Sequence, residues 1–74
     1  MVNPFYKIVT FFSKKYEPLT NEQLDYISIA LYHALGIFKT REEAFQVIQY
    51  LAENGVLDLV KNEDSTFSVK LKEN

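Results

Sequence analysis

Cysteine is absent from this 74-residue sequence, and histidine occurs only once, as His33. The lack of cysteine excludes disulfide bonds and thiolate metal sites, and a single histidine cannot form a metal-binding cluster. With only two glycines, the chain also lacks a glycine-rich phosphate loop, and no serine, histidine and acid grouping is evident. We therefore expect a protein that is not an enzyme and that holds no metal or cofactor.

Long apolar runs are also lacking. The longest run near the N-terminus, from Ile8 to Phe12, is too short to cross a membrane, and two lysines rather than a small-residue cleavage site follow it. We predict a soluble cytoplasmic protein without membrane contact. Residues 1–74 predict one domain, near the size at which a single core is sufficient, so self-association is an expected source of further stability.

The sequence has no strongly basic segment. Its net charge is −2. Residues 1–19 carry three lysines against one glutamate (+2), residues 20–36 carry two acids without a lysine or arginine (−2), and residues 37–55 and 56–74 each sum to −1. A phosphate-binding face is usually basic, so this distribution argues against nucleic-acid binding without eliminating it.

Apolar and aromatic side chains, at 47% and 15% of the chain, are plentiful. Asn3 and Pro4 offer a cap and a first helical position, which predicts a helix over residues 4–16. Glu17-Pro18 ends it, because the residue before proline avoids the helical region. Its inner face would carry Phe5, Ile8, Val9, Phe12 and Tyr16.

Two capping boxes predict the next helices. Thr20 to Gln23 begins a helix over residues 20–35 that Gly36 ends, and Thr40 to Glu43 begins another over residues 40–54. The predicted inner positions are Leu24, Ile27, Leu31, Ala34 and Leu35 in the first of these helices, and Ala44, Phe45, Ile48, Leu51 and Ala52 in the second.

Residues 56–71 read as a β-hairpin. A strand over residues 56–61 leads into a polar turn at residues 62–65 and a returning strand over residues 66–71. In the returning strand, apolar residues alternate with polar ones, which predicts one buried and one solvated face. The alternating residues are Phe67, Val69 and Leu71 against Thr66, Ser68 and Lys70.

This order of elements, with Leu51-Ala52-Glu53-Asn54-Gly55-Val56-Leu57 leading into the hairpin, resembles winged helix-turn-helix proteins of bacteria, archaea and their viruses and plasmids. The resemblance implies an α+β fold of three helices followed by a two-stranded β-hairpin wing. Leu19 lies in a brief extended link, where such proteins often place a short strand. The resemblance to these proteins further implies a homodimeric transcriptional regulator that binds double-stranded DNA.

If the usual docking of that family applies, the third helix lies in the major groove and the wing contacts the backbone or minor groove. Gln46 and Gln49 would then read adenine edges. The predicted phosphate contacts are Lys39, Thr40, Arg41, Lys61, Asn62 and Lys70. Glu42 and Glu53 on the same helix face would repel phosphates, so an ordinary solvated face is the alternative.

Large apolar side chains also fall outside the predicted inner faces, and they predict a dimer or partner surface: Tyr6, Phe11, Tyr26, Ile29 and Tyr32. The alternative is a core that wraps wider than these faces. A partner surface, together with the acidic charge, supports a second function, a winged-helix protein–protein interaction module that inhibits or scaffolds a partner and binds no nucleic acid.

Overall fold

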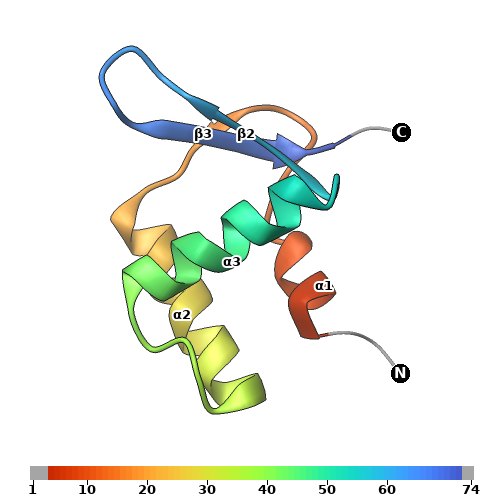
Figure 1. Ribbon diagram of the computed structural model, residues 1–74, viewed down its shortest axis with the longest axis vertical. Coiled ribbons are helices and arrows are strands. Elements are labelled where there is room, and N and C mark those ends of the chain that lie inside the picture. Colours follow the sequence, from red (N-terminus) through yellow and green to blue (C-terminus); the bar gives the residue numbers. More distant parts are fainter. Residues whose placement is uncertain (1–3, 73–74) are drawn as a thin grey trace.

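The computed structural model describes residues 4–72, apart from the side chains of residues 4, 6 and 7. A short helix α1 (Pro4–Val9) and strand β1 (Glu17–Pro18) precede the two long helices α2 (Asn21–Leu35) and α3 (Arg41–Glu53). Strands β2 (Leu57–Lys61) and β3 (Phe67–Leu71) follow. Figure 1 shows α2 and α3 on one side of the sheet, with α1 at the end of α3 nearest β2.

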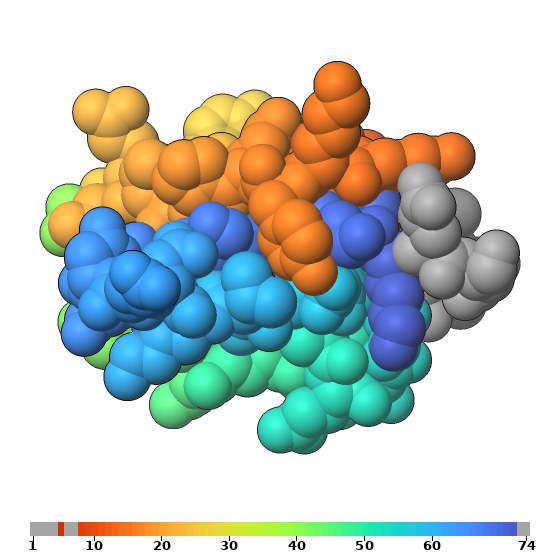
Figure 2. Space-filling view, turned by 90° about the horizontal axis from the view of Figure 1, so that it is seen from above, coloured from red at the N-terminus to blue at the C-terminus, as the bar shows by residue number. Residues whose placement is uncertain are grey.

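The sheet is antiparallel and three-stranded, in the order β1-β3-β2. Leu59 pairs with Val69 in the hairpin, and Glu17 pairs with the same Val69 from the other side. Seen from the sheet side, the segment after α1 and the hairpin lie next to each other across the surface (Figure 2). Because β3 is the central strand, its outward residues Ser68 and Lys70 are half-buried, while inward Val69 is almost fully buried.

The predicted fold of three helices followed by a two-stranded hairpin is therefore wrong. The protein has two long helices and a three-stranded antiparallel sheet, whose first strand comes before α2 in the sequence. The predicted helix over residues 4–16 is reduced to a short helical segment of six residues. The extended link expected near Leu19 is real, and its strand is Glu17–Pro18.

The early end of α1 has a long-range cause. The N–H groups of Phe11 and Phe12 donate to the carbonyls of Ile8 and Val9, which tightens the last turn. Beyond it, the carbonyl of Ser13 accepts from the N–H of Leu71, so the chain joins the sheet instead of continuing as a helix. Aromatic and β-branched residues in this segment also favour extended backbone.

The predicted ends of α2 are confirmed. The hydroxyl of Thr20 accepts from the N–H of Gln23, and the Gln23 side chain accepts from the N–H of Thr20, which completes the capping box. At the other end Gly36 adopts a left-handed φ of 74°, and its N–H donates to the carbonyl of Tyr32.

The second capping box is only half formed. The hydroxyl of Thr40 accepts from the N–H of Glu43, as predicted. The carboxylate of Glu43 accepts from that hydroxyl rather than from the backbone N–H of Thr40, so the reciprocal bond is missing. Thr40 therefore caps α3 and its hydroxyl is occupied.

The core lies between the helices and the sheet. It is centred on Ile27 and Leu31 of α2, Ile48 of α3, Leu57 of β2 and Val69 of β3, all of them at most 2% exposed. Ala34 and Leu35 were predicted to be buried, but they are exposed, because the last turn of α2 extends away from the sheet beyond the rest of the molecule (Figure 1). Within the described residues, no helix is both long and apolar enough to span a bilayer.

Candidate functional site

The outer face of α2 carries a stripe of four exposed side chains, Glu22, Tyr26, Ile29 and His33, which we call the α2 stripe. Their spacing of four, three and four residues places them on one face of the helix. Tyr26 is 58% exposed and Ile29 is 57% exposed. The two large apolar side chains thus lie in the middle of the stripe, with a carboxylate at one end and an imidazole at the other.

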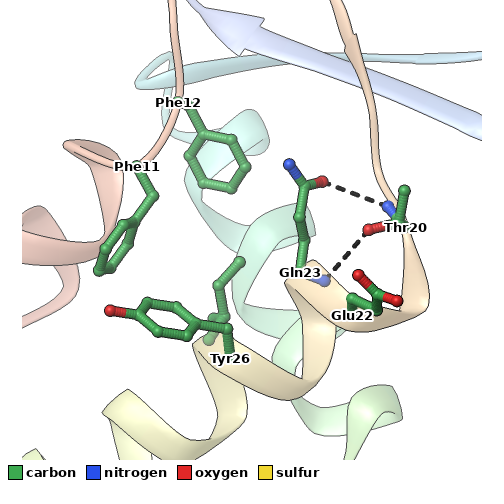
Figure 3. Close-up of a pocket in the computed structure, with 7 residues that line it drawn as sticks. Phe11, Phe12, Thr20, Glu22, Gln23 and Tyr26 are labelled. Atoms are coloured by element: carbon green, nitrogen blue, oxygen red, sulfur yellow. Dashed lines mark hydrogen bonds between the residues drawn. The ribbon is translucent and has the colours of Figure 1, made fainter.

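A groove lies beside the α2 stripe, between α2 and the segment that follows α1. Phe11 packs edge-on against Tyr26, with ring centroids 4.9 Å apart, so the two rings are in contact and both line this groove (Figure 3). The groove has a volume of about 440 Å³ and is lined by Phe11, Phe12, Thr20, Glu22, Gln23, Tyr26 and Ile27. Its aromatic wall and its carboxylate can receive an apolar side chain and a hydrogen-bond donor.

On the α3 side of α2, basic side chains are held by neighbours in the protein. The Arg41 guanidinium donates to both carboxylate oxygens of Asp25, at 2.6 and 2.9 Å. Lys39 Nζ lies 4.8 Å from the centre of the Tyr32 ring. Among the described side chains, Arg41 and Asp25 form the only ion pair, so the charge of Arg41 is neutralised, while Lys39 over the Tyr32 ring keeps its charge.

The Arg41 contact holds the pKa of Asp25 below its ordinary value. A carboxyl group with a depressed folded-state pKa stabilises the fold above its unfolded pKa of about 3.9, and the contribution is lost as pH falls through the lower folded value. We expect Asp25→Asn to lower the urea midpoint at pH 7, and the difference from wild type to vanish towards pH 2. Both side chains are about half exposed, so the effect is small.

The control is Glu63→Gln in the hairpin turn, which removes an exposed carboxylate of the same charge. Its urea midpoint should follow that of wild type across the same pH range. A difference between Asp25→Asn and wild type that stays constant down to pH 2 would show that the Arg41 contact does not stabilise the fold.

The structure does not bring the predicted phosphate contacts together as a free basic surface. Lys39 and Arg41 have the partners described above, and Thr40 serves as the cap of α3. The Asn62 side chain donates to the hydroxyls of Thr66 and Ser68, both at 3.0 Å, and thereby orders the hairpin turn.

Lys70 is half-buried on the central strand, with Nζ 4.8 Å from the centre of the Tyr16 ring. The hydroxyl of that tyrosine donates to Asp58, and this hydrogen bond raises the pKa of Tyr16 above its ordinary value. Tyr16, predicted on the inner face of a helix, instead lies exposed on the outside of the sheet. Of the predicted wing contacts, Lys61 alone is exposed without a partner among the described side chains.

Gln46 and Gln49, the predicted base-reading residues, are exposed on α3. They line a shallow hollow of about 450 Å³ together with Asn21, Leu24, Arg41, Glu42 and Phe45. Arg41 is paired, so the charge left in this hollow is the negative charge of Glu42. Two amides beside a carboxylate offer no electrostatic attraction to phosphate.

The predicted partner-surface residues are exposed wherever the structure describes them. Phe11, Tyr26, Ile29 and Tyr32 are 42–58% exposed, and the first three lie on or beside the α2 stripe. The side chain of Tyr6 lies outside the described part of the chain. Val47, which is not among the predicted inner positions of α3, is buried in the core.

Sequence patterns did not predict a second aromatic cluster, which Phe5, Phe38 and Tyr50 form. The ring centroid of Phe5 lies 6.1 Å from that of Phe38 and 6.3 Å from that of Tyr50. Phe38 has a left-handed φ of 67°, which costs about 1–2 kcal/mol for a residue other than glycine. Its half-buried packing against Phe5 offsets that cost.

No group of three or more histidine, cysteine, aspartate or glutamate side chains with a metal-binding arrangement occurs among the described residues. Comparisons of the chain with protein-family models, with curated proteins and with solved structures each found no match. Function must therefore be inferred from these surfaces.

Proposed function

We propose that the protein is a non-enzymatic protein-interaction module whose contact surface is the α2 stripe with Phe11. The observation that supports this most is the exposure of Tyr26 and Ile29, each more than half accessible on the same helix face. Exposed apolar side chains that are grouped and bordered by polar ones are typical of protein contact sites. Aromatic side chains are also the residues that most often dominate binding energy at such sites.

The charge distribution supports a protein partner over a phosphate backbone. The outward face of α3 carries Glu42 and Glu53, and the hairpin turn carries Glu63 and Asp64, all of them exposed. Arg41 is neutralised by Asp25. Duplex DNA is bound chiefly through the neutralisation of phosphates by lysine and arginine, and this surface opposes it.

A second candidate function is duplex DNA binding by α3, and the resemblance to winged helix-turn-helix proteins belongs to this candidate. The observation in its favour is that Gln46 and Gln49 are exposed near the middle of α3, where their amides can reach a groove. Lys61, Lys14 and Lys15 are exposed as well. These lysines lie outside α3, so they do not cancel its acids.

A salt titration with a mixed-sequence DNA duplex distinguishes the two functions. We expect the wild-type protein to leave the fluorescence anisotropy of a labelled duplex unchanged at about 50 mM salt, where phosphate contacts are strongest. A positive control is the double variant Glu42→Lys with Glu53→Lys, which makes the outer face of α3 basic and should bind. Saturable binding of the wild type that weakens steeply as salt rises would overturn the proposed function in favour of the second.

A further inference from the structure

We propose that the partner of the α2 stripe is a second copy of the chain, docked so that the two α2 helices run antiparallel about a two-fold axis. This inference rests on the proposed function and names its partner. The axis would pass the outer face of α2 midway between Tyr26 and Ile29.

The spacing of the α2 stripe suits a two-fold contact. Positions 22 and 33 lie equally far from the point between residues 27 and 28, and so do positions 26 and 29. In an antiparallel pair, residues at equal distances from the axis face each other. Glu22 therefore faces the partner's His33, and Tyr26 faces the partner's Ile29, and each contact occurs twice.

The ends of the α2 stripe are complementary in charge and hydrogen bonding. An imidazole N–H donates to a carboxylate in either charge state of the ring, so Glu22 and the partner's His33 can form a hydrogen bond. Lys39 lies at the same end of α2 as His33, over the ring of Tyr32, and adds positive charge there. A parallel arrangement would place Glu22 against the partner's Glu22, which is repulsive.

The groove next to Tyr26 gives the apolar middle of the contact a place to pack. Both Tyr26 and Phe11 line it (Figure 3). The partner's Ile29 approaches this groove, because Ile29 faces Tyr26 across the axis. A specific dimer buries about 800 Å² on each partner, roughly 15% of the 5245 Å² exposed surface of this chain. The contact must then include Phe11 and Tyr32 on the two flanks of the stripe.

A charge exchange tests this geometry, with dissociation constants measured by sedimentation equilibrium at pH 7. His33→Glu places two carboxylates opposite each other at both ends and should weaken the dimer about ten-fold. Adding Glu22→Lys restores opposite charges across the axis and should return the constant close to that of wild type. The matched control adds Glu53→Lys instead, which changes net charge equally but lies on α3, and should leave the dimer weak.

Rescue by Glu22→Lys but not by Glu53→Lys supports the antiparallel pair. Rescue by neither variant overturns it, because a parallel pair opposes lysine to lysine and glutamate to glutamate. Equal rescue by both also overturns it, because the dimer would then respond to net charge and not to the position of the charge. A wild-type protein that is monomeric at every concentration also overturns this inference, while leaving the proposed function to be judged by the DNA titration. Circular dichroism of each variant verifies that it is folded.

Discussion

Leu31→Ala is expected to lower the free energy of unfolding by about 2–5 kcal/mol. Leu31 is fully buried in the middle of α2, within the core that α2 shares with α3 and the sheet. Its truncation removes apolar contacts and leaves a cavity that the neighbouring core side chains cannot fill. A domain of this size has a total stability of roughly 4–11 kcal/mol, so the loss is a large part of the whole.

Leu35→Ala is the matched control for that experiment, since it makes the same chemical change in the same helix. Leu35 lies in the last turn of α2 and is 36% exposed, so its truncation should cost less than about 1 kcal/mol. Urea unfolding of both variants at equal protein concentration gives the comparison. Equal costs would mean that the packing around α2 differs from the one described.

Ile29→Asp is expected to raise the dissociation constant of the dimer by roughly a hundred-fold or more. Ile29 lies next to the proposed two-fold axis, so the substitution places two carboxylates in the apolar centre of the contact. A buried charge without a partner costs about 3 kcal/mol or more, which corresponds to that factor. The fold itself should be retained, because this side chain is more than half exposed in the single chain.

Val60→Asp is the corresponding control, because Val60 is an exposed apolar residue on β2, away from α2. Size-exclusion chromatography over a series of dilutions should place Ile29→Asp at the monomer position, with Val60→Asp eluting like wild type. If both variants elute like wild type, the contact does not involve the α2 stripe.

Local signals in the sequence were sufficient for the two long helices and the hairpin. The capping box at Thr20 and the left-handed Gly36 fix α2 through hydrogen bonds within a few residues of one another. The end of α1 could not be predicted in this way, because it depends on the hydrogen bond between Leu71 and Ser13 at the two ends of the sequence. Residues 10–16, which local periodicity had assigned to the helix, therefore form the link that leads into β1.

The candidate site also combines features that local sequence signals predict with features that depend on long-range contacts. Helical spacing alone placed Tyr26 and Ile29 outside the core, and the structure exposes both. Arg41 was predicted as a phosphate contact from its position at a helix start, but its partner Asp25 lies 16 residues away in the sequence. Lys70 is likewise held over Tyr16, and that pairing exists only because β1 joins β3. The availability of a charge for binding depends on such tertiary contacts.

Sedimentation equilibrium of the wild-type protein, from micromolar to millimolar concentration, tests most directly the claim that this chain is an interaction module that pairs through α2. We expect the apparent mass to rise with concentration towards twice the 8.7 kDa of one chain, and the rise to be abolished in Ile29→Asp. A mass of 8.7 kDa at every concentration, or an equal rise in Ile29→Asp, would contradict the claim.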